Sequence, residues 1–286
     1  MRIDLHAHST CSDGTRTPAE LVADARRADL DAIAITDHDT TSGWGEATVA
    51  AHEHGVTLVP GVEISCERDG RSVHLLGYLV DPANGDLSAE LARARHSRAT
   101  RLERMVARLV EGGIPVTYAA VLAKVPPGAT PGRPHIADAL VASGAVASRD
   151  EAFARWLHDR SPYYVHHYAP DPLRAVGLVR AAGGVAVLAH PFTQNRGAGV
   201  LTDRAIAELA QAGLRGLEAD HPDHDGPARA KAHALAFRLG LLVTGSSDYH
   251  GAGKTTRLGE NLTDPAALAT IEAEATGAAV VRPERR

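Results

Sequence analysis

The run Asp4-Leu5-His6-Ala7-His8-Ser9-Thr10-Cys11-Ser12-Asp13-Gly14 places two histidines and two aspartates next to a short apolar segment at the start of the chain. Side chains of an extended strand alternate between its two faces, so His6 and His8 point the same way. Both imidazoles can therefore reach one cation. A single His-x-His pair is weak support for a metal site, because such pairs also occur by chance.

Four further segments of this kind follow along the chain. Each places a histidine or a carboxylate just after an apolar run: Thr36-Asp37-His38-Asp39, Gly61-Val62-Glu63, Ala189-His190-Pro191 and Ser247-Asp248-Tyr249-His250. Five such segments predict a polynuclear metal site. Imidazole together with carboxylate suits manganese, iron or zinc better than calcium or magnesium, which prefer oxygen ligands alone. Metals bridged by a carboxylate lie roughly 3.5–4 Å apart, the spacing of two-metal phosphoester hydrolases.

Short apolar runs alternate with longer helical patterns through most of the chain. The predicted strands are Arg2–His6, Ala32–Thr36, Thr57–Glu63, Val73–Leu79, Val185–Ala189, Gly216–Ala219 and Leu241–Gly245. The first helix is well marked, because Thr17 and Glu20 fit a capping box with Pro18 at the first helical position. This alternation predicts an α/β fold with a parallel sheet, and seven strands favour an irregular barrel.

A barrel explains where the motifs lie. His6, His38, Glu63, His190 and Asp248 come at or just after the predicted strand ends, and active sites of such barrels form at the carboxyl ends of the strands. His74 is an exception, since it lies near the start of its predicted strand. Either that strand is misplaced by the prediction or the chain runs differently there.

The alternation stops between Val80 and Asp171. Residues Leu87–Glu111 read as one long, arginine-rich amphipathic helix, and further helix follows to about Leu157. We expect residues 1–86 and 171–286 to form the barrel, and residues 87–170 to form a helical insertion over its mouth.

Composition favours an enzyme of the cytoplasm. The formal net charge is −5, so no global basic field attracts nucleic acid. Cys11 and Cys66 are the only cysteines, which argues against a disulfide framework. No signal peptide precedes Asp4, and no apolar run is long enough to span a membrane. No obligate protein partner is evident from the sequence.

The motifs together resemble the PHP (polymerase and histidinol phosphatase) family of phosphoesterases. The matching pieces are Asp4-Leu5-His6-Ala7-His8-Ser9, Ser12-Asp13-Gly14, Thr36-Asp37-His38, Gly61-Val62-Glu63-Ile64-Ser65, His74-Leu75-Leu76-Gly77-Tyr78, Ala189-His190-Pro191 and Ser247-Asp248-Tyr249-His250. They occur in the family's order. The resemblance implies a distorted (β/α)7 barrel with a helical insertion, and two or three divalent metal ions, with manganese expected and iron or zinc as alternatives.

The same resemblance implies a role for each ligand. One metal takes His6, His8, Glu63 and Asp248. Glu63 bridges to a second metal, which His74 and His190 share. A third is held by the remaining residues of the metal-binding and catalytic set: Asp13, His38 and His250. Some members of the family bear histidine where this chain has Asp13, and an aspartate weakly favours a harder metal than zinc.

The insertion narrows the resemblance to one branch. Gly132-Arg133-Pro134-His135 looks like the branch of nucleoside 3′,5′-bisphosphate phosphatases and 5′→3′ exonucleases acting on short RNA. There, an insertion arginine grips phosphate, which suits the bidentate fork of Arg133. His135 and His224 are the other expected substrate contacts, with His221 as the alternative to His224. Without such a role, Arg133 makes a salt bridge at a helix end.

The leading hypothesis is therefore a metal-dependent phosphatase that hydrolyses the 3′-phosphate of nucleoside 3′,5′-bisphosphates, with short RNA as a further substrate. The enzymatic alternative is a histidinol-phosphate phosphatase, which leaves Arg133 and the insertion unexplained. An alternative of another class is a non-catalytic, metal-stabilised module like those attached to DNA polymerases. Such a module should lack some ligands, whereas this chain has all nine.

Overall fold

A computed structural model describes residues 1–193 and 201–283. Within these residues the strands are β1 (Ile3–Asp4), β2 (Ala32–Ile35), β3 (Thr57–Arg68), β4 (Arg71–Tyr78), β5 (Val185–Leu188), β6 (Gly216–Asp220) and β7 (Leu242–Gly245). The helices are α1 (Pro18–Arg27), α2 (Trp44–His54), α3 (Gly85–Glu111), α4 (Tyr118–Leu122), α5 (Arg133–Ala142), α6 (Arg149–Ala152), α7 (Pro172–Ala181), α8 (Asp203–Ala212), α9 (Gly226–Leu239) and α10 (Pro265–Glu274). A π-helical turn, η1 (Phe153–Leu157), continues α6, and a 3₁₀ turn, η2 (Gly251–Gly253), follows β7.

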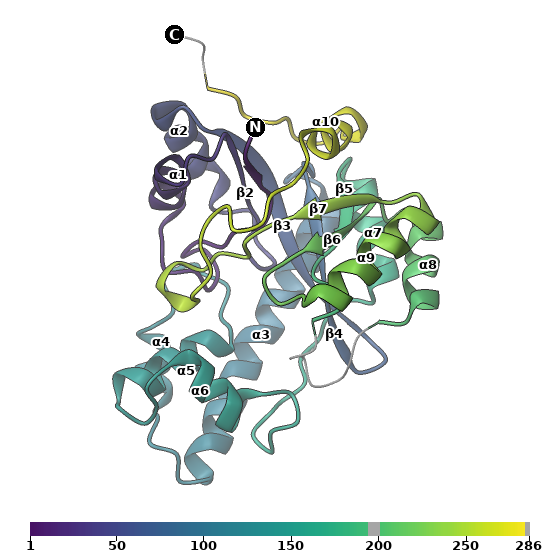
Figure 1. The fold of residues 1–286 in the computed structure, drawn as a ribbon. Coiled ribbons are helices and arrows are strands. Elements are labelled where there is room, and N and C mark those ends of the chain that lie inside the picture. Colours follow the sequence, from purple (N-terminus) through teal and green to yellow (C-terminus); the bar gives the residue numbers. More distant parts are fainter. Residues whose placement is uncertain (194–200, 284–286) are drawn as a thin grey trace.

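The strands form one sheet in chain order, from β1 to β7. A parallel bridge between Ala7 and Tyr249 joins the segments that follow β1 and β7, so the sheet nearly closes into a barrel. Figure 1 shows α1 and α2 on one side of this barrel and α7, α8 and α9 on another. The predicted α/β barrel with a helical insertion is confirmed.

The expectation of an all-parallel sheet is wrong for β4, which runs antiparallel to both of its neighbours. Residues Asp69 and Gly70 join β3 to β4 as a two-residue turn, and both have a positive φ. A turn this short leaves no room for the helical crossover that a parallel pair requires. Asp-Gly between two apolar runs is a strong signal for a hairpin, and the sequence analysis missed it.

The first predicted helix, α1, begins as expected. The Thr17 hydroxyl accepts a hydrogen bond from the backbone N–H of Glu20 (3.2 Å), and the Glu20 carboxylate accepts one from the N–H of Thr17 (2.9 Å). The helix then buries Leu21, Val22 and Ala25 against α2 and the first strands. This packing fixes the loop after β1, which carries most of the first motif.

Helices α3 to α6 gather at the end of the barrel away from the two chain termini (Figure 1). They share a core cluster of their own, whose buried members lie between Leu102 and Val165. The helix α3, predicted over Leu87–Glu111, forms over Gly85–Glu111. In the described part of the chain, no helix is long and apolar enough to cross a membrane. The division of the chain after residues 86 and 170 stays a prediction.

Candidate metal centre

The two histidines of the first motif meet as the strand geometry predicts. The Nε2 atoms of His6 and His8 lie 3.0 Å apart, and both residues are fully buried. Asp248, at the end of β7, places Oδ1 3.4 Å from Nε2 of His6 and 3.3 Å from Nε2 of His8. Three donor atoms thus converge on one point, and the loops after the first and last strands supply them.

Glu63 lies at the centre of the site and divides its two oxygens between different histidines. Its Oε2 faces Nε2 of His6 (3.4 Å), Nε2 of His8 (3.2 Å) and Nδ1 of His38 (3.0 Å). Its Oε1 faces Nδ1 of His74 (2.6 Å) and Nε2 of His190 (3.2 Å). This arrangement has the geometry of a bridging carboxylate.

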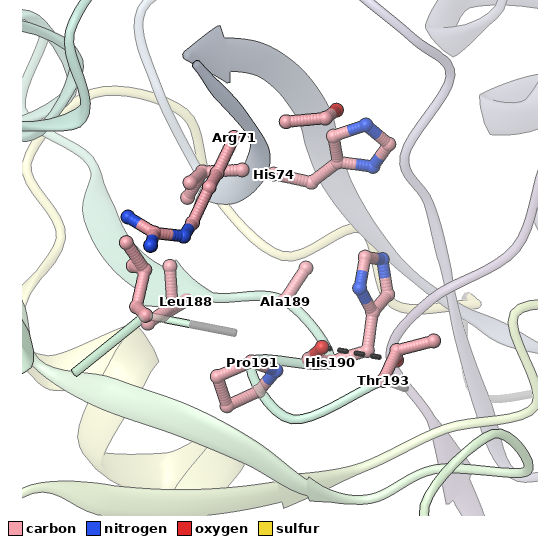
Figure 2. A pocket seen from close by; sticks show the side chains of 10 residues that line it. Arg71, His74, Leu188, Ala189, His190, Pro191 and Thr193 are labelled. Atoms are coloured by element: carbon pink, nitrogen blue, oxygen red, sulfur yellow. Dashed lines mark hydrogen bonds between the residues drawn. The ribbon is translucent and has the colours of Figure 1, made fainter. Parts of the chain in front are cut away.

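His74 reaches the site because β4 is antiparallel. Its partner in register is Ser65, two residues beyond Glu63 on β3, so the start of β4 lies at the same end as the carboxyl ends of the other strands. The rings of His74 and His190 lie edge to face, with centroids 5.3 Å apart. Figure 2 shows both rings beside a small cavity that Pro191 and Thr193 also line.

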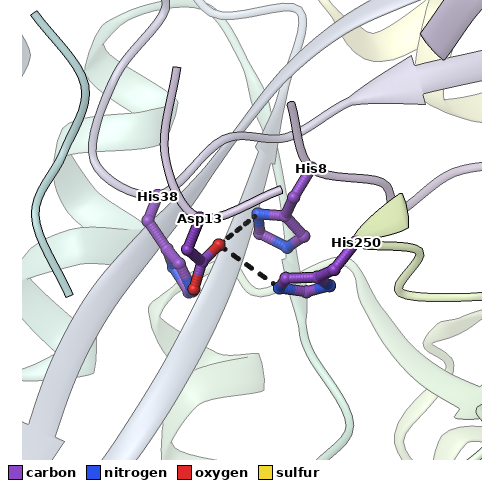
Figure 3. A group of neighbouring side chains, drawn as sticks. All are labelled: His8, Asp13, His38 and His250. Atoms are coloured by element: carbon purple, nitrogen blue, oxygen red, sulfur yellow. Dashed lines mark ion pairs between the residues drawn. The ribbon is translucent and has the colours of Figure 1, made fainter. Parts of the chain in front are cut away.

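The remaining three predicted ligands form a second group around Asp13. The Oδ1 atom of Asp13 lies 3.3 Å from Nε2 of His250 and 3.7 Å from Nδ1 of His8, as Figure 3 shows. Its Oδ2 lies 3.8 Å from Nε2 of His38. The donor atoms of His8, Asp13, His38 and His250 lie within 4.8 Å of one another. All nine predicted ligands are thus brought together.

Two residues of β6 and its loop belong to the site and were missed or left open by the sequence. The fully buried Glu218 accepts a hydrogen bond from Nδ1 of His6 (3.0 Å) and another from the backbone N–H of His190 (3.0 Å). It therefore orients two ligand residues. His221 places Nε2 3.3 Å from Oδ2 of Asp248. An acid in the middle of the apolar run Gly216–Ala219 was the available signal for Glu218.

The charges of the site favour ionised carboxylates. Burial disfavours the charged form of Glu63, but the imidazoles of His74 and His38 outweigh it and hold the pKa of this carboxyl well below its usual range. Burial also disfavours the charged form of Asp248, but the Lys254 ammonium outweighs it and lowers the pKa of this carboxyl. The Nζ atom of Lys254 lies 2.5 Å from Oδ2 of Asp248. The ligand oxygens are therefore unprotonated at neutral pH.

Two ligand residues have a backbone conformation that side chains rarely adopt. His190 has φ of 27° and Asp248 has φ of 48°, both in the left-handed region. Such conformations cost about 1–3 kcal/mol each and persist where the surroundings determine them, most often at functional sites. The chain bends sharply at these two strand ends, which directs the side chains into the cluster.

The predicted substrate residue Arg133 lies at the start of α5. Its Nη1 donates to the backbone carbonyl of Leu157 (2.8 Å) and to the carboxylate of Asp159. Its guanidinium lies 5.3 Å from the ring centroid of Tyr164. Arg133 thus makes the helix-end salt bridge that we weighed against phosphate binding, and its contact with substrate stays a prediction.

The histidines predicted to contact substrate are bound to backbone groups. His135 accepts a hydrogen bond at Nδ1 from the N–H of Gly132 (3.0 Å), which caps the first turn of α5. His224 donates from Nδ1 to the carbonyl of Ala219 (2.9 Å) and accepts at Nε2 from the N–H of Phe192 (3.1 Å). Both nitrogens of His224 are occupied, and so are those of His221, whose Nδ1 accepts from the N–H of Asp223 (3.0 Å) and whose Nε2 faces the carboxylate of Asp248 (3.3 Å). Neither alternative for the contact after β6 therefore has a free ring nitrogen, and His221 differs in facing the predicted ligand Asp248.

The chain matches the family model described as PHP domain over residues 4–116. A 3′,5′-nucleoside bisphosphate phosphatase from Chromobacterium violaceum is 36% identical over 255 residues, which cover 89% of each chain. The chain belongs to the PHP domain family. Within that family, a 5′-3′ exoribonuclease from Haemophilus influenzae is 33% identical over 91% of this chain and 94% of its own length.

This PHP domain chain also has a near structural neighbour. A crystal structure of a Bifidobacterium adolescentis protein, classed with the metal-dependent phosphoesterases, superposes with a TM-score of 0.93 at 42% sequence identity and covers 96% of both chains. The predicted family is therefore confirmed. The resemblance to the branch of bisphosphate phosphatases and exoribonucleases is confirmed as well.

Proposed function

We propose that this chain is a metal-dependent phosphoesterase that hydrolyses the 3′-phosphate of nucleoside 3′,5′-bisphosphates. The observation that carries the proposal is the convergence of nine buried or nearly buried ligands, with Glu63 at their centre, in a chain similar to a bisphosphate phosphatase over most of its length. Hydrolysis of short RNA from the 5′ end is a second activity, which the similarity to the exoribonuclease favours. We place the protein in the cytoplasm, in line with its two free cysteines.

The donor set fits two or three divalent transition metals. Each candidate position combines imidazole nitrogens with at least one carboxylate oxygen, and no cysteine of the described residues belongs to these groups. We propose His6, His8, Glu63 and Asp248 for one metal, and Glu63, His74 and His190 for a second. Asp13, His38 and His250 would hold the third. Manganese is the metal we expect, with iron or zinc as alternatives.

When bound, divalent metal ions activate water and neutralise the charge of phosphate oxygens. The chain's own residues keep this centre in place. Glu218 fixes the tautomer of His6 by accepting from its Nδ1, which leaves Nε2 free to serve as a donor atom. Lys254 adds a positive charge beside Asp248, on the side of His221. Lys254 and His221 thus both contact Oδ2 of Asp248 and hold this ligand in position.

Substrate recognition involves residues of the insertion and of the loop after β6. Arg133, His135 and His224 are the residues that we assign to phosphate binding, with His221 as the alternative to His224. The insertion approaches the ligand loops directly, since Arg149 donates to the backbone carbonyl of Asp13 (3.2 Å) and the N–H of Thr130 donates to that of Cys11 (2.9 Å). A substrate at the metals would therefore contact residues of the insertion.

A substrate panel with purified, manganese-loaded protein tests this proposal. Adenosine 3′,5′-bisphosphate, histidinol phosphate and a 5′-phosphorylated RNA dinucleotide are compared by kcat/KM. We expect the bisphosphate to be the best substrate, with release of its 3′-phosphate. A higher kcat/KM on histidinol phosphate would contradict the proposal and favour the alternative phosphatase. Absence of hydrolysis of all three after metal loading would favour a non-catalytic module.

A further inference from the structure

A buried arginine of α3, Arg101, lies against the ring of Tyr164. Only 6% of Arg101 is exposed, and its Nε and Nη2 atoms are buried and make no hydrogen bond. Within residues 1–193 and 201–283, no carboxylate forms an ion pair with it. Leaving a buried charged group unpaired is costly, since its lost hydration is not replaced. An anionic ligand bound to Arg101 would offset this cost.

Helix α3 places Arg101 one turn after a residue that is bound beside the metal centre. Arg98, one turn earlier on the same face of the helix, donates from Nε to Oδ2 of Asp39 (2.8 Å) and from Nη2 to the Ser65 hydroxyl. Ser65 is two residues beyond Glu63 on β3 and pairs with His74. The face of α3 that carries Arg101 is thus anchored beside the strands that supply Glu63 and His74.

A second unpartnered side chain, His167, lies in the same place. The segment after η1 is tied to α3 by the N–H of Tyr168, which donates to the Ser97 hydroxyl (2.7 Å), and to β3 by the N–H of Glu67, which donates to the carbonyl of Pro170 (3.0 Å). Both ring nitrogens of His167 are buried and have no hydrogen-bond partner among the residues that the structure describes. His167 therefore lies between the helix that carries Arg101 and the strand that carries Glu63.

The charges around these two residues are not balanced. Arg98 is paired with Asp39, and Arg133 with Asp159, while Arg101 has no ion pair of its own among the described residues and shares the field of Asp159 with Arg133. Burial, together with the positive charges of Arg101 and Arg98, lowers the pKa of His167 to about 2, so this ring is neutral. Arg101 and Arg133 both lie against the ring of Tyr164, with guanidinium carbons 4.8 and 5.3 Å from its centroid. The region has donors and a net positive charge.

We propose that Arg101 and His167 bind the non-reacting phosphate of the substrate, with the guanidinium of Arg101 as the principal donor. This inference rests on the proposed function, because it names the group that a bisphosphate has and a monophosphate lacks. A guanidinium fork matches a phosphate bidentately, and an imidazole N–H adds a third donor. Arg133 borders the same region, but Asp159 already holds it, so Arg101 is the specificity-determining residue.

Arg101→Met tests the proposal, with Arg104→Met as the matched control on an exposed position of the same helix. On a nucleoside 3′,5′-bisphosphate, Arg101→Met should lower kcat/KM by about 30-fold or more, as expected when a buried charge pair is lost. On the matching nucleoside 3′-monophosphate, which has no 5′-phosphate, the loss should stay below about threefold. Arg104→Met should change neither value. Metal content should be equal in all three proteins.

A measurement without catalysis separates this inference from the proposed function. Adenosine 5′-monophosphate, a product with only the non-reacting phosphate, should raise the melting temperature of the metal-loaded wild type and of Arg104→Met. It should have little effect on Arg101→Met. Without ligand, Arg101→Met should melt no lower than the wild type, because it removes an unpaired buried charge; a structural arginine would give a lower value.

The outcomes are distinct. If the wild type hydrolyses no bisphosphate but only Arg101→Met loses stabilisation by the nucleotide, the phosphate site stands and the proposed function is wrong. Equal losses on both substrates, or none on either, would overturn the site while leaving the proposed function intact. Full stabilisation of Arg101→Met by adenosine 5′-monophosphate would overturn the site as well. His167→Phe should reproduce the selective loss to a smaller extent.

Discussion

Glu63 is the residue on which the centre depends. Its Oε2 serves the histidines of the first strand ends, and its Oε1 serves His74 and His190. Each other carboxylate contacts fewer of these rings. A ligand that serves two cations cannot be replaced at one of them without weakening the other.

We predict that Glu63→Gln is the most damaging single carboxylate change. The amide keeps the shape but offers only one good ligand oxygen, so we expect a loss of about 100-fold or more in kcat/KM, beyond the 10–100-fold typical of outer-shell changes. Elemental analysis should also find less metal per chain. Glu67→Gln, four residues along the same strand and partly exposed, is the control and should be close to wild type. Near-normal turnover in Glu63→Gln alongside an inactive Asp248→Asn would show that Glu63 does not bridge.

The hairpin of β3 and β4 separates what the sequence could predict, the location of the strand ends, from what it could not, the direction of β4. The strand ends that carry His6, His38, Glu63, His190 and Asp248 could be located from apolar runs and the residues that follow them. The direction of β4 was not deduced, because a pattern of side chains gives the presence of a strand and not its partner. The hydrogen-bond register of Ser65 with His74 then decides which end of β4 faces the metals.

Other parts of the site depended on long-range contacts. The acid in the apolar run Gly216–Ala219 marks Glu218 as unusual but does not give its partner, and Arg101 lies in a helix whose sequence reads as an ordinary amphipathic surface. Their roles follow from what surrounds them: Glu218 accepts a hydrogen bond from His6 across the barrel, and Arg101 forms no ion pair with a carboxylate in the described part of the chain. The pairing of Arg133 with Asp159, 26 residues apart, could not be predicted either.

The hairpin turn itself can be tested. Gly70 has φ of 71°, and a Cβ there would meet no atom within 4 Å, so only backbone strain opposes a side chain. We predict that Gly70→Ala lowers the free energy of unfolding by about 1–2 kcal/mol, the usual cost of a left-handed conformation. Gly85→Ala, at the open first turn of α3 without a positive φ, should be neutral or stabilising. Urea unfolding of both variants checks this, and equal effects would contradict the turn.

The fold gathers a cluster of buried histidines and carboxylates at one end of the barrel. The loops after the strands, the start of β4 and the inserted helices all approach this end, and the cluster that results holds more buried imidazoles and carboxylates than a packed core tolerates without compensation. Metal ions supply that compensation. We therefore expect chelation to abolish hydrolysis and to lower the melting temperature, since metals bind the folded chain and not the unfolded one.

Protons compete with metals for this cluster. Burial disfavours the charged form of His8, but the carboxylates of Asp248 and Glu63 outweigh it and raise the pKa of His8 to about 9. A metal binds only the neutral imidazole. Below about pH 9, metal binding must therefore release a proton from His8. Metal affinity should then fall as the pH falls, by roughly tenfold per pH unit for each proton displaced. Above about pH 9 this dependence should level off for His8.

Titration of metal-free protein with Mn²⁺ in buffers of different ionisation enthalpy measures the released protons directly. At pH 7 we expect release of about one proton or more per chain, and less release at pH 9.5. His52→Gln, an exposed position on α2, is the control and should release the same number as the wild type. Metal binding without proton release at pH 7 would mean that His8 is already neutral in the empty site. The carboxylates would then be balanced by another cation, and Lys254, in contact with Asp248, would be the first candidate to replace.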